Sequence, residues 1–272
     1  MILRLAPLLF ALLTLAACNK TETPAPAATT APVAAEPAAP ATDTAPGAQV
    51  DATTDAATPA PAGPIVAPSG PAPVTGTDYV EIAGGQPFQP GTGKIEVVEV
   101  FGYTCPHCAS FEPLVAAWKA KLPADVAFTP VAAPFGGYWI PYAKAFYTAE
   151  AMGLLGRTHD AMFRAIHVER SLPVQPLPTP EQLGAFYAKH GADPQQFIST
   201  MSSFSVDAKL KRAQQFLTRS GVDSTPTIVV EGKYRVTTPT SLEDSLRVAE
   251  HLIARERAAR AVAGAPAPAA GG

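Results

Sequence analysis

The sequence predicts an α/β domain whose sheet is interrupted by an all-helical segment. Three observations support this prediction. An apolar, β-branched run at residues 94–101 leads directly into a helical pattern and then into a second apolar run at 126–131. Residues from about 138 to 220 have helical patterns throughout, and strand character returns only at 227–236, before a last helix. The expected order is therefore strand–helix–strand, helical insertion, strand–strand–helix.

The first half should contain a parallel strand–helix–strand unit. Residues 78–82 fit a short edge strand, and residues 94–101 fit a strand that is covered on both faces. The helix at 105–118 carries its large apolar residues on one face, and Pro113 is expected to kink it. The strand at 126–131 follows this helix, so we expect it to pair in parallel with the first.

The helical insertion divides at glycines and prolines. Breaks at Gly153/Gly156, 173–180 and 191–194 separate the expected helices, which are 143–155, 158–168, 181–190 and 205–219. Beyond the insertion, residues 227–236 should form a hairpin that turns at Glu231-Gly232. The closing helix, 241–259, begins at Ser241 with a pattern like a capping box.

The N-terminal residues have the features of an export signal. Residues 1–17 combine Arg4, an apolar stretch and two small residues before Cys18. Leu15-Ala16-Ala17-Cys18 resembles the lipobox of bacterial lipoproteins, so Cys18 is the expected lipidated first residue of the mature chain. A plain signal peptide cut elsewhere is the alternative. The apolar run is shorter than the roughly 20 residues that span a bilayer.

Two further segments lie outside the expected domain at 77–260. Residues 18–76 are rich in Ala, Pro and Thr, and they bury too little apolar surface to offset their conformational entropy. We expect a disordered tether, with a reach of roughly 40 Å as a coil and roughly 180 Å as polyproline II. Residues 261–272 form a similar tail.

Charge and cysteine usage limit the possible functions. A net charge of −3 is too small to indicate nucleic-acid binding or strong attraction to a membrane surface. The chain has three cysteines, one at the lipobox and two in a single motif, which leaves no structural disulfide framework. The paired cysteines are therefore interpreted as chemical groups.

That pair is Cys105-Pro106-His107-Cys108, on the expected strand-to-helix turn. A helix N-terminus presents unpaired N–H groups and the positive end of the dipole, and both favour an exposed thiolate at Cys105. A thiolate is the form that attacks a disulfide or is expelled from one. Pro106 fits the first helical turn, and His107 can stabilise the thiolate by charge or hydrogen bond. Zinc would need about four ligands, and we expect no metal because no second Cys or His pair completes a site.

The chain resembles the DsbA-like thiol–disulfide oxidoreductases of bacterial envelopes over residues 78–259. The resemblance rests on four stretches, which are Glu99–Cys108, Phe135-Gly136-Gly137, Gly221–Thr227 and Gly232-Lys233-Tyr234. It implies a thioredoxin-like fold with an inserted helical subdomain. It also implies that the only redox group is a disulfide between Cys105 and Cys108, with no other cofactor.

The resemblance assigns a role to Glu99. It places the carboxyl beneath the disulfide, where it shuttles the proton of the less accessible Cys108. Family members often pair this glutamate with a lysine, and the corresponding position here is Thr129, so the ion pair is left open. Glu99 facing solvent at a sheet edge is the alternative. Glu96 points to the opposite face of a regular strand, and alternation alone does not say which acid is buried.

Thr225-Pro226 is the expected second half of the site. A cis proline would leave the Thr225 backbone free to pair with an extended peptide as an added strand. Valine precedes this proline in many oxidases of the family, whereas threonine is commoner in reductases and isomerases. An ordinary trans proline is the alternative.

We therefore expect a monomeric oxidase of the bacterial periplasm, held to a membrane by lipid. It would pass its disulfide to reduced or unfolded exported proteins through a mixed disulfide at Cys105, and a membrane partner resembling DsbB would reoxidise it. A reductase or isomerase of the same fold, or a non-catalytic lipid-anchored chaperone, are the alternatives. The remaining histidines, His159, His167, His190 and His251, are interpreted as surface or packing residues. Arg255, Arg257 and Arg260 are interpreted as solvated residues at a helix end.

Overall fold

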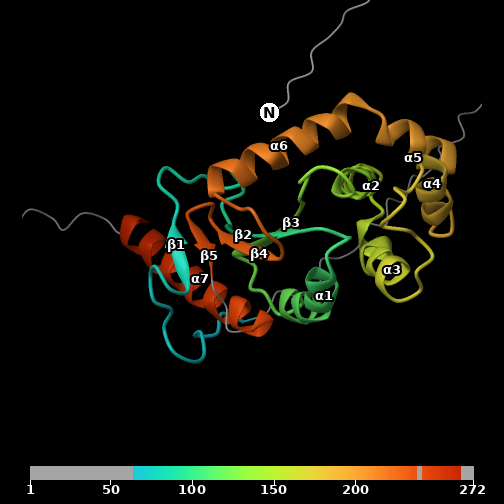
Figure 1. Ribbon diagram of the computed structural model, residues 1–272. Helices are drawn as coiled ribbons and strands as arrows, with labels where there is room; N and C mark the ends of the chain where they lie inside the picture. Colours follow the sequence, from blue (N-terminus) through green and yellow to red (C-terminus); the bar gives the residue numbers. More distant parts are fainter. Residues whose placement is uncertain (1–63, 238–240, 265–272) are drawn as a thin grey trace, which may run out of the picture. The chain divides into compact units, whose positions relative to one another are not determined.

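The computed structural model describes residues 64–237 and 241–264, which all belong to one compact unit. Its five-stranded sheet has the order β1-β5-β4-β2-β3 (Figure 1). The strands are β1 (Tyr79–Glu81), β2 (Ile95–Phe101), β3 (Val126–Ala132), β4 (Thr227–Val230) and β5 (Tyr234–Val236). β2 and β3 pair in parallel, and the other neighbours pair antiparallel. The predicted parallel unit, edge strand and hairpin are confirmed.

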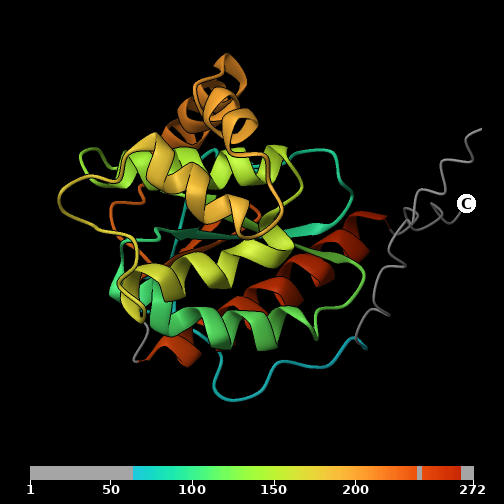
Figure 2. The ribbon, with the colours of Figure 1, turned by 90° about the vertical axis from the view of Figure 1, so that its right-hand side faces the viewer.

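Helices cover both faces of this sheet. α1 (Pro106–Lys119) and α7 (Leu242–Gly264) lie on one face, and α2 (Trp139–Ala151) and α6 (Phe204–Ser220) lie on the other (Figures 1 and 2). The insertion is completed by α3 (Leu155–His167), α4 (Pro180–Ala188) and α5 (Pro194–Met201). An α/β thioredoxin-like fold with an inserted helical region is thus confirmed.

Several helix boundaries differ from the prediction. α2 begins at Trp139, and Gly156 lies inside α3, so Gly153 alone marks that break. α5 was not predicted as a separate helix. Its start is defined by Asp193, whose carboxylate accepts from Gln196 N–H at 2.7 Å and caps a short helix that a propensity pattern does not resolve. α1 continues through Pro113 to Lys119.

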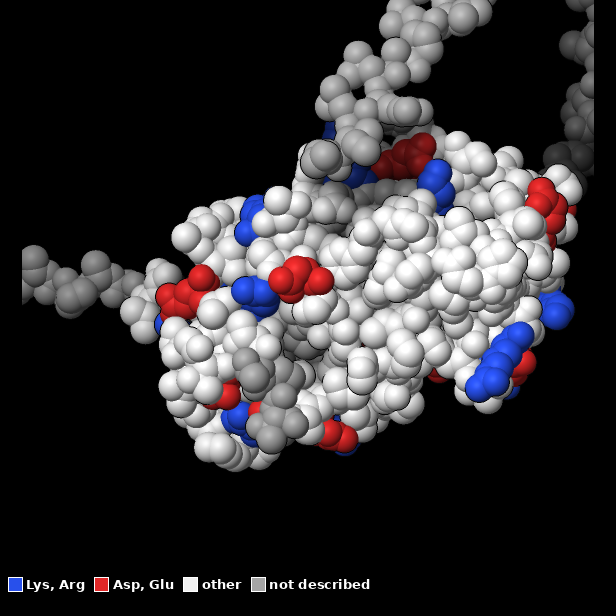
Figure 3. Space-filling model, in the orientation of Figure 1, with Lys and Arg blue, Asp and Glu red and all other residues white. Residues whose placement is uncertain are grey.

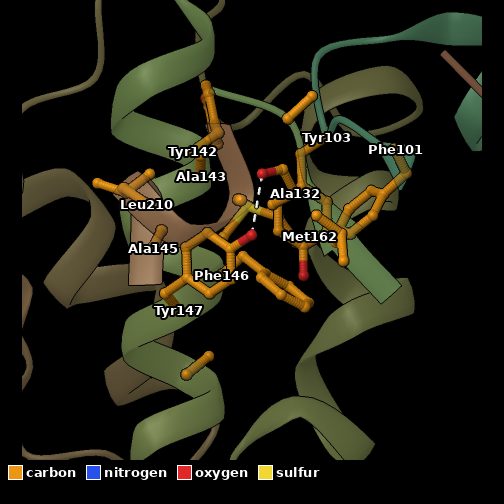
Figure 4. Packing of buried hydrophobic residues seen from close by; sticks show 14 of the residues in the cluster. Phe101, Tyr103, Ala132, Tyr142, Ala143, Ala145, Phe146, Tyr147, Met162 and Leu210 are labelled. Atoms are coloured by element: carbon orange, nitrogen blue, oxygen red, sulfur yellow. Dashed lines mark hydrogen bonds between the residues drawn. The ribbon is translucent and has the colours of Figure 1, made fainter. Parts of the chain in front are cut away.

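The central strand β2 is buried along its whole length. Val98 and Val100 face a core shared with the helical insertion, whereas Ile95 and Val97 face a second core with α1 and α7. Figure 4 shows part of the first core, where Phe101 and Tyr103 pack beside Phe146 and Met162. The Tyr147 hydroxyl donates to the Ala132 carbonyl at 3.1 Å, which ties α2 to the end of β3 (Figure 4).

Both expected domain boundaries need correction. Residues 64–76, expected to belong to the tether, lie against α7, where Arg247 donates to the Pro71 carbonyl and His251 contacts the Ser69 carbonyl at 3.2 Å. At the other end, α7 extends beyond the expected limit of 260 to Gly264. These hydrogen bonds from α7 side chains to backbone carbonyls explain why residues 64–76 belong to the domain although they carry little apolar surface.

Arg255, Arg257 and Arg260 of α7, expected to be solvated, form ion pairs while their side chains remain 26–48% exposed. Arg257 binds the Asp125 carboxylate at 2.7 and 3.1 Å, Arg255 binds Glu81 at 2.9 Å, and Arg260 binds Glu231 at 2.8 Å. These pairs attach the helix to loops and strands that are distant in sequence. Local sequence patterns do not predict these ion pairs, because the two partners of each pair lie more than 25 positions apart in the sequence.

The expected signal peptide, Cys18, most of the tether and residues 265–272 lie outside the described residues. Over 64–237 and 241–264, no helix is both long and apolar enough to cross a bilayer. On the face drawn in Figure 3, basic and acidic side chains are intermixed and widely spaced.

Candidate active site

Cys105 forms the N-cap of α1. Its backbone is extended, with φ −87° and ψ 117°, and its sulfur accepts from the Cys108 N–H at 3.4 Å. Pro106 occupies the first turn, where its missing N–H leaves no helical bond unmade. The local sequence therefore places a sulfur in the position that a Ser or Asp side chain takes at other helix starts.

The Cys105 thiol is less accessible than expected, since the residue is only 8% exposed. The cause is the loop before β4, because the Cys105 Sγ lies 3.5 Å from the Thr225 carbonyl oxygen and donates to it. The pKa of Cys105 is lowered to about 5, because hydrogen bonds from the Cys108 side chain, the Thr225 side chain and the N–H groups of Cys108 and His107 stabilise the thiolate and together outweigh burial.

Cys108 has the opposite character. It is fully buried in the core shared with the helical insertion, and burial raises the pKa of its thiol strongly, with further contributions from the Cys105 sulfur. Both residues are thiols in the structure, so it depicts the reduced form. The site thus combines one sulfur that favours the thiolate with one that retains its proton, and the expected resting disulfide stays a prediction.

Glu99 is buried, which excludes the alternative of a solvent-facing carboxyl. Its side chain shares the face of β2 that packs against α1. Burial is the main cause that raises the pKa of Glu99 to about 8, the Glu112 carboxylate and Cys105 raise it further, and Lys119 opposes them. Among the described residues, the Glu99 carboxyl has no hydrogen-bond partner.

The expected correspondence between Thr129 and Glu99 is wrong. β3 runs parallel to β2 with Val98 opposite Thr129, so Thr129 lies on the face opposite to Glu99. The Thr129 hydroxyl instead donates to Glu96 Oε1 at 3.0 Å. Strand register, which cannot be derived from the motif spacing, decides this contact.

Glu96 is the second buried acid of β2, and it has a full set of partners. Its carboxylate accepts from Phe88 N–H at 2.6 Å and Gln89 N–H at 3.0 Å besides Thr129. Burial raises the pKa of Glu96, while these hydrogen bonds lower it. The two acids therefore differ, because Glu96 anchors a loop whereas Glu99 has no such structural bond.

Thr225-Pro226 has the cis conformation that the sequence predicted. Both residues are half-buried, and they lead into β4 next to the cysteine pair. A second cis bond, Gln175-Pro176, was not predicted. Pro106 and His107 are exposed beside the pair, and His107 reaches Cys105 through its backbone N–H.

Two histidines of α3, expected to be surface or packing residues, hold the loop that precedes Cys105. His159 Nδ1 lies 2.8 Å from the Tyr103 hydroxyl, and His167 Nε2 lies 2.7 Å from the Tyr103 carbonyl oxygen. His159 Nε2 also lies 3.3 Å from the Glu112 carboxylate. The sequence carried a sign of this arrangement, because His159, Phe163 and His167 recur every four residues on one helical face.

Over the described residues, no three His, Cys, Asp or Glu side chains gather as metal ligands do. The chemistry that the visible arrangement supports is thiol–disulfide exchange. One sulfur favours the thiolate, its partner lies three residues along the same helix, and a buried carboxyl with a pKa near 8 interacts electrostatically with Cys105.

Comparison with known proteins agrees with this geometry. A family model described as Thioredoxin matches residues 92–248. The chain is 43% identical over 187 residues to the thiol:disulfide interchange protein DsbA of Pseudomonas aeruginosa, covering 68% of this chain and 86% of that protein. It is 42% identical over 188 residues to the DsbA of Azotobacter vinelandii, covering 68% and 85%. A crystal structure of oxidoreductase DsbA from Xylella fastidiosa is 47% identical, covers 68% of this chain and 98% of that one, and superposes with a TM-score of 0.66.

Proposed function

The chain belongs to the DsbA family of thiol:disulfide interchange proteins, and from this membership we propose that it works as a disulfide oxidase for exported proteins. Thiol:disulfide oxidoreductase activity follows from the family. The direction of transfer, the clients and the location are our proposal. A non-catalytic chaperone is not favoured by relatives whose names describe disulfide interchange.

The observation that carries the oxidase direction is the difference between the two thiols. A client thiolate attacks the Cys105 sulfur, a client–Cys105 bond forms, and the Cys105–Cys108 bond breaks. Cys108, whose pKa is raised, takes up a proton as it leaves. The client's second thiolate then attacks its own bridged sulfur and expels Cys105, which leaves readily because its pKa is about 5.

Glu99 is the proposed donor and acceptor of the Cys108 proton. Its carboxyl is largely protonated at neutral pH, because its pKa is raised to about 8, and it interacts electrostatically with Cys105 at the start of α1. When the protein is reoxidised, the proton returns from Cys108 to the Glu99 carboxylate. His107 adds to the stabilisation of the Cys105 thiolate, and the Thr225 backbone beside it receives the client peptide as an added strand.

The proposed setting is the bacterial periplasm, with Cys18 lipidated and residues 18–63 as the tether. The proposed partners are reduced or unfolded exported proteins and a DsbB-like membrane oxidase, and the proposed state is a monomer. The Leu15–Cys18 motif supports the anchor, and the exposed residues Pro106 and His107 between the two cysteines support access for a partner protein.

The reduction potential of the purified protein tests the direction. We expect the Cys105–Cys108 couple, equilibrated with glutathione, to lie well above roughly −270 mV, the value of thioredoxin. A value at or below that of thioredoxin would instead assign a reductase. Cys105→Ala separates the chaperone alternative, since loss of the sulfur should abolish client oxidation, whereas a chaperone would keep its full effect on an unfolded client.

A further inference from the structure

A continuous chain of polar contacts joins the active-site helix, the helical insertion and the loop before Cys105. The Glu112 carboxylate of α1 lies 3.3 Å from His159 Nε2, and His159 Nδ1 lies 2.8 Å from the Tyr103 hydroxyl. We call these three residues the histidine bridge. The side chains of His159 and Glu112 are only 18% and 13% exposed, so water screens their contact weakly.

Both ring nitrogens of His159 are used, and their partners define the tautomer. A carboxylate only accepts, so Nε2 carries a proton toward Glu112, and in the neutral imidazole the Tyr103 hydroxyl donates to Nδ1. Phe101, Phe146 and Phe163 surround the imidazole with ring centroids at 5.0 to 6.0 Å. This packing fixes the orientation of the ring, and the ring in turn restrains the Glu112 carboxylate.

Glu112 also interacts electrostatically with Glu99, and its negative charge is the second cause of the raised pKa there. Glu112 and His159 line one pocket of about 710 Å³ together with Pro130, the residue opposite Glu99 in β3. The other charged groups at this pocket are Lys119 from α1, Asp160 from α3 and Lys94 before β2. Among these, only Lys119 and Glu112 contribute to the electrostatic environment of Glu99.

We propose that His159 is a positioning residue for thiol–disulfide exchange, which acts through Glu112 by holding that carboxylate beside the buried Glu99. Glu99 then exchanges its proton with Cys108 in the presence of a fixed neighbouring charge. This inference rests on the proposed role of Glu99. It assigns to α3, an element of the insertion, a part in the chemistry of the thioredoxin-like core.

The step to measure is the one in which Cys108 loses its proton. A protein that carries glutathione on Cys105 is prepared, and the release of glutathione is followed as a function of pH. Cys108 attacks the Cys105 sulfur, the Cys105–Cys108 bond forms, glutathione leaves as thiolate, and the Cys108 proton passes to Glu99. The rate should rise with a midpoint set by Glu99, and that midpoint should disappear in Glu99→Gln.

His159→Leu releases Glu112, which can then turn toward water, where its charge acts less on Glu99. The midpoint should therefore fall by about half a pH unit. Glu112→Gln should lower it as well, and His159→Leu should add nothing in the Glu112→Gln background. His159→Gln keeps an N–H donor for Glu112, so it should retain the original midpoint.

His167→Leu is the matched control, because His167 holds the same Tyr103 from the same helix face without contacting Glu112. Its midpoint should stay unchanged. An unmoved midpoint in His159→Leu, or additive shifts in the double variant, would overturn the inference and leave the Glu99 role intact. A midpoint that persists in Glu99→Gln would overturn both. If His159→Leu does not fold, His159→Ala, which also lacks an N–H donor for Glu112, provides the same comparison in the parent and in the Glu112→Gln background.

Discussion

Cys105 Sγ lies 3.5 Å from the carbonyl oxygen of Thr225, across 120 positions of sequence, and in its thiol form it donates to that oxygen. This contact joins the two halves of the active site. It buries a thiol that local sequence alone would leave open at a helix end. It also places the Thr225 backbone, where we propose that a client pairs, next to the reacting sulfur.

The lowered pKa of Cys105 makes the stability of the reduced form depend on pH. The folded-state pKa is about 5 and the ordinary value is 9.0, so this contribution is fully present above pH 9 and is lost as the pH falls through 5. The disulfide form has no such thiol. Urea unfolding of both forms should show that the free energy of unfolding of the reduced form increases, relative to that of the oxidised form, between pH 4 and pH 8. A difference independent of pH would contradict a depressed pKa.

His107→Ser isolates the contribution of the imidazole. The backbone N–H that contacts Cys105 remains in the variant, so any change reports on the side chain. We expect the pKa of Cys105 to rise by about one unit and the reduction potential to fall, because the thiolate loses a stabilising group. Ultraviolet absorbance of the thiolate during a pH titration measures the first quantity. His190→Ser, two residues beyond the end of α4, is the control and should titrate like the parent.

Glu96 and Glu99 allow a comparison of two buried acids on one strand. Glu96→Ala leaves the N–H groups of Phe88 and Gln89 and the Thr129 hydroxyl without their acceptor, and it should destabilise the protein by about 2–4 kcal/mol. Thr129→Val removes one donor and should cost about 1 kcal/mol. Denaturant unfolding measures both. The thiolate titration of Cys105 should be unchanged, and a shift of it would contradict a purely structural role for Glu96.

Much of the architecture was accessible to sequence reasoning, because it follows from local patterns. The run at 94–101 is apolar on both faces and became a wholly buried strand, and the Cys105-to-Cys108 motif sits at the start of α1 as expected. Thr225-Pro226 was assigned from the resemblance, and the structure confirms both the cis bond and its position beside Cys105.

The parts that could not be predicted depend on register and on distant partners. The match of Thr129 to Glu99 failed because the parallel register of β2 and β3 places Thr129 on the other face. His159 was interpreted as a surface or packing residue because its partners, Tyr103 and Glu112, come from a loop and a helix more than 45 positions earlier. The Arg257–Asp125 pair was missed for the same reason.

Glu99→Gln should change the pH dependence of stability in a defined direction. The folded-state pKa of Glu99 is raised to about 8 from 4.5, so the folded state holds a proton that the unfolded state has lost. Folding is therefore penalised increasingly as the pH rises from 4.5 to 8, and the penalty is constant above that range. The amide introduced by Glu99→Gln does not ionise, so the variant does not have this penalty.

The variant should accordingly be more stable than the parent at pH 8, by on the order of 3 kcal/mol, and equal to it near pH 4. Urea unfolding of the reduced proteins at the two pH values measures this difference. Glu112→Gln should be measured beside it, because this variant removes a charge that raises the pKa of Glu99. It should show only a part of the increase in stability at pH 8 that is expected for Glu99→Gln. A Glu99→Gln protein that is less stable at pH 8 than the parent would mean that the carboxylate is stabilised by its surroundings, and that Glu99 does not hold a proton at neutral pH for Cys108.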